Sequence, residues 1–321
     1  MKAAVTLIIF NRPDTTRLVF DAIAKAKPKK LLVIADGPRP DRPGEAERCA
    51  AARAIIGTVD WDCEILTNFS DINLGCRRRV ASGLDWVFSQ VEDSIILEDD
   101  CLPHPDFFSF CDALLDRYRE DGRVMAIGGA NLTADRHWGG GSYYFSRYCH
   151  IWGWASWRRA WRHYDVEMAA LPDFLERQHE HFPAPAEAQY WSDLFRATRD
   201  GLIDTWDYQW QFTILRQQGL TIVPNANLVS NIGFGPDATH TKDTGGRGAV
   251  VPVHALGALR HPSEIAYNRL ADQHFFRLVH HRSFARRARD KLVRRWRAFN
   301  RWRDRVQLSG GGRSADSGRI S

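Results

Sequence analysis

The sequence lacks most of the features that would assign it to a specialised class of protein. Only six of its 321 residues are cysteine, with no CxxC pair and no Cys/His cluster at the spacing of a zinc site. The start is not typical of a signal peptide, because the charged Met1 and Lys2 lead directly into a short apolar run that ends at a turn. No window of about 18 apolar residues is present. We therefore expect a reduced, cytoplasmic protein without a membrane-spanning helix.

Several well-known catalytic and phosphate-binding motifs are also missing. The sequence has no GxxxxGK[ST] loop, no GxGxxG after an apolar run and no GxSxG turn. The glycine stretches at 139–141 and 245–246 have the wrong surroundings for such loops. These absences disfavour a P-loop NTPase, a dinucleotide-dependent dehydrogenase and a serine hydrolase.

What is present is an ordinary globular composition with an uneven charge. Hydrophobic residues make up 44% and charged residues 26%, which argues against disorder, collagen-like repeats and a disulfide scaffold. The length predicts two domains, or one large α/β unit with an appendage. The net charge is +5, yet residues 282–306 alone hold 11 basic and 2 acidic side chains. The body of the protein is therefore mildly acidic, and the tail is strongly basic.

The first half alternates short apolar runs with longer amphipathic stretches. The apolar runs lack the in-out alternation of a half-exposed sheet, so they are typical of parallel strands buried on both faces. We expect an α/β fold with a mostly parallel, Rossmann-like sheet and helices on both faces. The expected strands are 4–10, 31–35, 63–67 and 94–97, and the expected helices are 15–24, 45–56, 77–89 and 106–119.

The second half changes in character and becomes rich in Trp, Tyr, Arg and Gly. Its pattern predicts helices at 186–199 and 206–217 and a short strand at 220–223, in a second lobe packed on the same sheet. The chain then turns basic with helical periodicity, and it ends in a Gly- and Ser-rich stretch typical of disorder. The boundaries that follow are a first half at 1–127, a second at 128–255, a basic helical extension at 256–308 and a disordered tail at 309–321.

The most informative segment is an apolar run that ends in three acids, Glu98, Asp99 and Asp100. The carboxyl edge of a parallel sheet is where open α/β folds bind ligands. Neighbouring carboxylates repel one another unless a cation compensates them, and all-oxygen ligands favour Mg²⁺ or Mn²⁺. On spacing alone an alternative stays open, in which Asp99 or Asp100 caps the helix that begins near Pro105. Other polar side chains follow the remaining strands: Asn11 and Arg12 after the first, Asp36 after the second and the segment 73–79 after the third.

Together these segments resemble the nucleotide-sugar-binding half of GT-A fold glycosyltransferases. The resemblance rests on residues 6–12, 35–36, 73–79 and 96–108, and it is strongest to N-acetylglucosaminyltransferase I-like enzymes, in which the acidic triplet is also followed by Pro-Asp-Phe-Phe. It continues through 153–154, 206–210 and 230–235, covers about residues 3–240, and extends to bacterial family 2 glycosyltransferases of the hemolytic-protein-like group.

The resemblance implies a role for each matching residue. Asn11, Arg12 and Asp36 would contact the nucleotide, and Arg79 would reach the nucleotide or its phosphates. Glu98 and Asp99 would hold ribose or donor sugar, Gly153 and Trp154 would belong to the donor site, and Asp100 would bind the metal. The members of this implied site are Asn11, Arg12, Asp36, Arg79, Glu98, Asp99, Asp100, Gly153 and Trp154.

Two further residues come from the second half. Asp207 lies where the family places its general base, although here the tryptophan pair encloses one acid and not two adjacent acids. The other interpretation of Asp207 is an acid that stabilises a helix N-terminus. His240 lies where many GT-A enzymes supply a third metal ligand, and its alternative is a solvated loop histidine.

The sequence thus predicts a Mn²⁺- or Mg²⁺-dependent glycosyltransferase. It would transfer a sugar, with inversion, from a nucleoside-diphosphate donor such as a UDP-sugar to a hydroxyl of a glycan or lipid-linked acceptor. The alternatives are a sugar nucleotidyltransferase, and a membrane- or polyanion-binding protein that acts through its basic tail.

The tail itself combines an apolar stripe with arginines over residues 282–306. This pattern predicts a helix lying on the anionic inner face of a membrane, which would make the protein peripheral there. The alternatives are a helix docked on the acidic body and, less favoured, nucleic-acid binding. The members of the stripe are Phe284, Ala288, Leu292, Trp296, Phe299, Trp302 and Val306.

Overall fold

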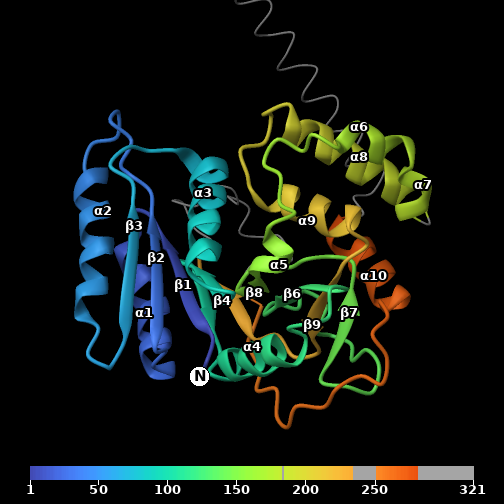
Figure 1. Cartoon of the computed structure of the whole chain (residues 1–321), viewed down its shortest axis with the longest axis horizontal. Coiled ribbons are helices and arrows are strands. Elements are labelled where there is room, and N and C mark those ends of the chain that lie inside the picture. Colours follow the sequence, from blue (N-terminus) through green and yellow to red (C-terminus); the bar gives the residue numbers. More distant parts are fainter. Residues whose placement is uncertain (183, 234–250, 281–321) are drawn as a thin grey trace, which may run out of the picture. The chain divides into compact units, whose positions relative to one another are not determined.

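Four parallel strands form the first half of an eight-stranded sheet (Figure 1). The computed structural model describes residues 1–182, 184–233 and 251–280. Within the sheet the first four strands follow the order β3-β2-β1-β4, with β1 at the centre of its half. Their bounds are β1 (Ala4–Ile9), β2 (Lys30–Ala35), β3 (Glu64–Phe69) and β4 (Asp93–Glu98).

The helices that connect these strands run back along the sheet. Helix α1 begins with Pro13, whose fixed backbone angle suits the first helical turn, and it ends at Lys27, which is left-handed with φ +47°. Each expected strand and helix of this half is present with ends shifted by at most two residues, so the expected α/β class is confirmed. The helices are α1 (Pro13–Ala26), α2 (Glu45–Ala54) with a 3₁₀ turn η1 (Ile55–Thr58), α3 (Gly75–Gln90) and α4 (Asp106–Arg117).

The second half of the sheet is mixed. Strand β8 lies between β4 and β6 and runs antiparallel to both, while β9 is parallel to β6 and antiparallel to β7 at the edge. Of these four strands only β9 was predicted from the sequence. Strands β7 and β8 are short and rich in aromatic residues and Ser, whereas β6 is a buried apolar run that was missed. Their bounds are β6 (Val124–Gly128), β7 (Tyr143–Ser146), β8 (Trp154–Trp157) and β9 (Leu220–Pro224).

Alternate residues of the strands enter two separate cores. In β1, Val5 and Leu7 pack with α1, α2 and α4 on one face of the sheet, whereas Ala4 and Ile8 pack with α3 on the other. Helices α5 (Arg158–Trp161) and α9 (Asp207–Arg216) complete the second face. The sheet is thus covered on both sides, as its buried parallel strands require.

A third core lies around the other side of α9. Phe212 of α9 meets Phe174 and Phe195, with ring centroids 5.1 and 5.5 Å away. The surrounding helices belong to the tryptophan-rich region and to the end of the described chain. They are α6 (Leu171–Glu176), α7 (Gln178–His181), α8 (Pro185–Arg199), α10 (Arg269–Phe275) and a π-helical turn η2 (Phe276–His280).

The start of the expected basic extension differs from its sequence pattern. Between residues 256 and 268 the chain forms no helix and lies along the body, where Ser142 N donates to Arg260 O at 2.7 Å. Helix α10 follows, and Met1–Val279 form one compact unit. The basic stripe 282–306, the tail 309–321 and His240 lie outside the described residues. No helix in the described part combines the length and apolarity needed to cross a bilayer.

Two short strands form a separate ribbon beside the carboxyl end of β4. Strand β5 (Cys101–Pro103) follows the acidic triplet directly and pairs antiparallel with β10 (Val229–Asn231). Segments about 130 residues apart in the chain are thereby brought together at this edge of the sheet.

Candidate active site

The acidic triplet lies at the carboxyl end of β4, next to the end of β1. The backbone N–H of Phe10 donates to Asp99 Oδ2 at 3.1 Å, which joins the two strand ends. Glu98 is the last residue of β4, and Asp99 and Asp100 form the turn into β5. The helix that follows begins only at Asp106, so neither Asp99 nor Asp100 caps it.

Arg12 reaches this triplet from the turn between β1 and α1. Its Nη1 lies 2.7 Å from Asp100 Oδ2 and 3.8 Å from Asp99 Oδ1. The structure therefore brings together three residues that the sequence predicted as one site. The ion pair is partly shielded from water, because all three side chains are less than a quarter exposed.

The ribbon of β5 and β10 fixes the position of Asp100. Ile232 N donates to Asp100 O at 2.8 Å, and Asn231 Nδ2 lies 3.5 Å from Asp100 Oδ1. Gly233 passes so close that an added Cβ would overlap Asp100 Oδ2. A side chain at position 233 would displace the carboxylate, so glycine is required there. Residues 230–235 fall within the resemblance, which implies no role for Gly233.

The cluster is electrostatically strained. Burial, followed by the charges of Asp100 and Asp99, raises the pKa of Glu98 well above its usual range, and Asp207 adds to this effect. Burial, followed by the charge of Asp100, also raises the pKa of Asp99. Among the described residues Glu98 Oε1 has no hydrogen-bond partner although it is buried. Such a group favours a further positive charge or donor beside it.

Asp36 lies at the end of β2, and its carboxylate accepts four hydrogen bonds from the protein. The donors are N–H groups of Gly37, Leu74 and Gly75 at 2.9–3.1 Å and Asn73 Nδ2 at 3.1 Å. Burial raises its pKa in spite of these bonds, which lower it. Asp36 therefore shapes the loop between β3 and α3, and its expected contact with a nucleotide stays a prediction.

Arg79 faces the ends of β2 and β3. Its Nε donates to Ala35 O at 3.1 Å, and its Nη2 donates to the backbone and side-chain oxygens of Asn68. The side chain is buried at the base of the loop that Asp36 organises. In this arrangement Arg79 holds the two strand ends together, and its expected contact with the nucleotide or its phosphates stays a prediction.

Asn11 is held by the buried Glu45, which forms an ion pair with the half-exposed Arg39. This pair was not predicted from the sequence. Asn11 Nδ2 donates to Glu45 Oε1 at 2.8 Å, and Arg39 binds both oxygens of Glu45 through its Nε and Nη2. The Arg39 hydrogen bonds lower the pKa of Glu45 to about 2. A signal was available, since Glu45 opens a helix after Gly44 and an arginine precedes it by six residues.

Asp207 is the first residue of α9. Its charge acts on Glu98, and its Oδ1 accepts a hydrogen bond from the Thr205 hydroxyl. Gln209 Nε2 in turn donates to Thr205 O at 2.7 Å. The carboxylate is therefore oriented at the N-terminus of a helix, where a negative charge is stabilised.

Cys76 lies in the first turn of α3, near the acidic side chains of the site. Burial raises the pKa of its thiol, and the charges of Glu98, Asp207 and Asp204 raise it further. An added Cβ on Gly75 would lie 3.3 Å from Asp204 Oδ2, so the loop before α9 approaches the start of α3. The sequence analysis did not single out Cys76 or Gly75 as part of the site.

Gly153 and Trp154 belong to the core and not to the surface of the site. Gly153 has φ +63°, and an added Cβ would lie 2.7 Å from the Val229 side chain. Glycine therefore allows the backbone at position 153 to pack closely against Val229. The side chain of Trp154 is fully buried and stacks on Trp206 with ring centroids 5.6 Å apart. Because β8 inserts into the sheet beneath α9, the Trp154 ring is not available to a donor sugar. The place in the donor site that the resemblance implies for Gly153 and Trp154 stays a prediction, and the burial of the ring argues against a stacking contact with sugar.

The donor atoms of the cluster suit a divalent cation that substrate helps to bind. Within the described residues no three His, Cys, Asp or Glu side chains form a complete metal cage. Asp100 nevertheless offers carboxylate oxygens at the protein surface, and the buried Glu98 Oε1 adds an unpaired oxygen beside it. Mg²⁺ and similar ions commonly use one or two carboxylates and complete their shell with water and phosphates. His240, the other expected ligand, lies outside the described residues.

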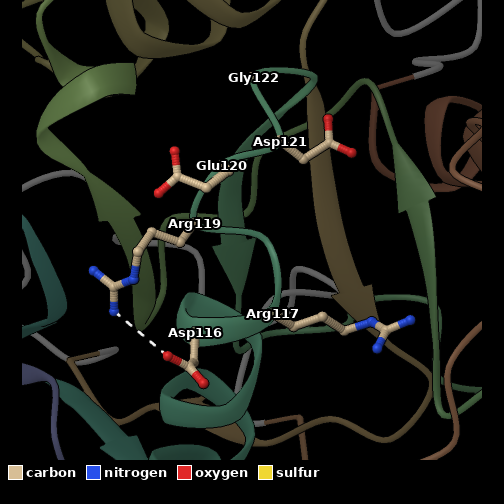
Figure 2. A pocket seen from close by; sticks show the side chains of 6 residues that line it. All are labelled: Asp116, Arg117, Arg119, Glu120, Asp121 and Gly122. Carbon is tan, nitrogen blue, oxygen red and sulfur yellow. Dashed lines mark ion pairs between the residues drawn. The ribbon is translucent and has the colours of Figure 1, made fainter.

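Two hollows lie at the amino edge of the sheet, away from these residues. The larger, of about 530 Å³, is lined by Asp116, Arg117, Arg119, Glu120, Asp121 and Gly122 in the turn between α4 and β6 (Figure 2). Figure 2 shows Arg119 turned toward Asp116, 3.7 Å away. The second, of about 430 Å³, adjoins the starts of β1, β2 and β4. Ligands of parallel sheets bind at the carboxyl edge, so we assign the site to the acidic triplet.

Comparisons with known proteins give a fold likeness only. No family model and no curated protein matches the chain. Similar solved structures include mouse xyloside xylosyltransferase 1, with 10% identity and a TM-score of 0.33 over 66% of this chain and 81% of that one. A UDP-glucose pyrophosphorylase complexed with UDP-glucose has 10% identity and a TM-score of 0.36 over 69% and 90%. The 4-diphosphocytidyl-2C-methyl-D-erythritol synthase of Anaerococcus prevotii has 11% and 0.30 over 49% and 72%. Scores this low assign no activity.

Proposed function

We propose that this chain is a metal-dependent glycosyltransferase of the GT-A type, which uses a nucleoside-diphosphate sugar, such as a UDP-sugar, as donor. The observation that carries the proposal is the convergence of Arg12, Asp99 and Asp100 at the carboxyl edge of the parallel strands, with Asp207 acting on the same cluster. Cationic and anionic groups at this edge suit a substrate that carries both phosphates and hydroxyls.

Each residue then has a chemical task. Asp100 holds Mn²⁺ or Mg²⁺, and when bound the ion neutralises charge on the departing diphosphate. Asp99 and Glu98 accept hydrogen bonds from hydroxyls of the ribose or sugar, and Arg12 binds the diphosphate. Asp36 and Arg79 hold the strand-end loops in place around the nucleotide.

Asp207 acts as general base in this proposal. The acceptor oxygen attacks the anomeric carbon as the bond from that carbon to the diphosphate oxygen breaks, and the acceptor proton passes to Asp207. The configuration at the anomeric carbon is inverted. A positioned carboxylate base of this kind contributes about 10²–10⁴-fold to the rate. The acceptor is a glycan or a lipid-linked hydroxyl.

Ligand-induced stabilisation and donor hydrolysis test the proposal together. UDP with Mn²⁺ is expected to raise the melting temperature of the wild-type protein more than either ligand alone, because each completes the site of the other. The purified protein is also expected to release UDP slowly from a UDP-sugar. Asp100→Asn should abolish both effects without unfolding the protein, because the amide has nearly the same shape but no charge.

Asp116→Asn provides the matched control, since Asp116 is exposed at the opposite edge of the sheet. Equal stabilisation of wild type and Asp100→Asn by UDP with Mn²⁺ would refute the metal role.

A sugar nucleotidyltransferase is the nearest competing activity. It would make a nucleotide sugar from a nucleoside triphosphate and a sugar phosphate, with release of pyrophosphate. The turn after β1 disfavours it, because α1 starts at Pro13 directly after Asn11 and Arg12 without a glycine-rich phosphate loop. Pyrophosphate released from UTP with a sugar 1-phosphate, in the absence of UDP release from UDP-sugars, would establish the nucleotidyltransferase instead.

A further inference from the structure

Arg12 is the cation that compensates the acidic cluster. Its Nη1 is 2.7 Å from Asp100 Oδ2 and 3.8 Å from Asp99 Oδ1, and within the described part of the chain no other cation lies within ion-pair distance of these two carboxylates. The guanidinium thus stands at the oxygen assigned above to the divalent cation.

The backbone of Arg12 is fixed, whereas its side chain is long. Arg12 O accepts hydrogen bonds from Thr16 N at 2.9 Å and from the Thr16 hydroxyl at 2.7 Å, and Pro13 restricts the chain that follows. The neighbouring Phe10 N is bound to Asp99. A change in the position of the guanidinium therefore requires only rotation of side-chain bonds, with no movement of β1 or α1.

One positive charge does not balance this cluster. Glu98, Asp99 and Asp100 are adjacent in sequence, and the charge of Asp207 also acts on Glu98. The buried Glu98 Oε1 has no hydrogen-bond partner within the described residues. Additional positive charge is therefore favoured at the cluster, but Asp100 Oδ2 is already paired with Arg12.

We propose that Arg12 is an exchangeable counter-ion, which occupies Asp100 Oδ2 until a divalent cation enters and then moves to the diphosphate of the donor. A cation held by Asp100 would otherwise lie beside the guanidinium, and the two positive charges would repel. A guanidinium suits the diphosphate because it binds two phosphate oxygens at once. This inference rests on the proposed function, since the diphosphate is the second partner of Arg12.

The exchange couples the two ligands. Divalent cation alone must displace Arg12 from Asp100 without supplying a new anionic partner, whereas UDP supplies its diphosphate. Each ligand is therefore expected to tighten the other by the same factor. The coupling depends on one side chain.

Arg12→Gln tests this coupling, with Mn²⁺ and UDP as the probes. The affinity for Mn²⁺ alone, measured from free Mn²⁺ by electron paramagnetic resonance, is expected to rise about three- to tenfold because a competing positive charge is removed. The affinity for UDP in saturating Mn²⁺ is expected to fall at least about tenfold, because a charge-assisted phosphate contact is lost. The two changes have opposite signs, which general damage to the site would not produce.

Two further variants serve as controls. Arg17→Gln removes the same charge from the exposed side of α1 and should leave both affinities unchanged. Arg12→Lys keeps the charge and should bind Mn²⁺ alone as weakly as wild type, which also shows that the effect does not come from misfolding.

Weaker or unchanged binding of Mn²⁺ alone by folded Arg12→Gln would overturn the inference. So would a wild-type protein that hydrolyses UDP-sugar fully in a metal chelator, because Arg12 would then replace the cation permanently. Failure of the proposed function would give a different result. Arg12→Gln would still change the affinities for Mn²⁺ and UDP in opposite directions, but the wild-type protein would hydrolyse no UDP-sugar.

Discussion

The two halves of the sheet use their polar side chains differently. In the parallel half every strand ends at the same edge, so the residues after β1, β2 and β4 gather there, with Arg12, Asp36 and Asp99 as examples. In the mixed half β7 and β8 run in the opposite direction. Polar groups near their ends are enclosed. For example, the Ser146 hydroxyl donates a hydrogen bond to the buried Asp272 at 2.6 Å. Strand direction thus decides which half gathers polar side chains at one edge of the sheet and which half encloses them.

Trp154→Ala is expected to have the largest effect on stability, and it tests the mixed half directly. Removing this buried ring from between Trp161, Trp206 and Trp210 leaves a cavity. The free energy of unfolding should fall by about 3–5 kcal/mol, measured by urea denaturation. UDP affinity at a temperature where the variant is folded should stay as in wild type. A more than tenfold loss of UDP affinity in the folded variant would return Trp154 to the donor site.

His150 gives the mixed half a pH dependence of its own. Burial against Phe275 lowers its pKa from 6.5 to about 4. Because the unfolded chain takes up the proton first, stability is complete above pH 6.5 and decreases as the pH falls toward 4. The decrease amounts to about 3 kcal/mol, at about 1.4 kcal/mol for each unit of the shift.

Urea denaturation of wild type and His150→Gln at pH 7 and pH 4.5 measures this contribution. The variant should lose less stability between the two pH values than wild type does. Identical losses would show that His150 is already protonated or solvated in the folded protein.

Asp207→Asn tests whether the mixed half supplies one catalytic group through the N-terminus of α9. Turnover of a UDP-sugar with an acceptor should fall by about 10²-fold, with UDP affinity nearly unchanged, because the base acts on the acceptor proton. The matched variant Asp204→Asn, in the preceding loop, should be much less affected. If Asp207→Asn turns over normally, Asp207 only stabilises the N-terminus of α9. Asp204 and Asp193 would then be the next candidates for the general base.

Deletion of residues 282–321 is expected to change the described unit least. Donor hydrolysis should persist, whereas binding to anionic vesicles should disappear, and the full-length interaction should weaken as salt rises. Vesicle sedimentation at two salt concentrations measures this. If the full-length protein does not bind anionic vesicles at low salt, the membrane-binding hypothesis is wrong. Lower thermal stability after the deletion would then indicate that the tail docks on the body of the protein.

The parallel half could be predicted from sequence because its strands are continuous apolar runs. Buried β-branched residues such as those of β1 and β2 leave a local signal, and the bounds agree with the structure. In the mixed half β7 and β8 gave no such signal, whereas β6 is a short apolar run that was missed. Their pairing depends on partners far along the chain, as for Trp154 in β8 and Ile96 in β4. Short strands of this kind are defined by tertiary packing and not by local pattern.

The candidate site could be predicted from sequence only in part, as the sheet could. Strand ends indicated Arg12, Asp99 and Asp100, which the structure joins. Sequence did not indicate which groups are already bound by the protein itself, such as Arg79 on Ala35 and Asn68. Nor did it reveal that Gly233 packs on Asp100. These contacts link distant segments, so no local pattern records them.

The position of β8 has a consequence for the order in which the protein matures during synthesis. Ser94 of β4 pairs with Ser156 of β8, about 60 residues later in the chain. When the parallel strands have left the ribosome, the outer edge of β4 is therefore still an unpaired strand edge, open to association with other chains. The edge closes only when β8 emerges and inserts between β4 and β6. The half that carries the acidic triplet therefore matures only together with the half that encloses the tryptophans.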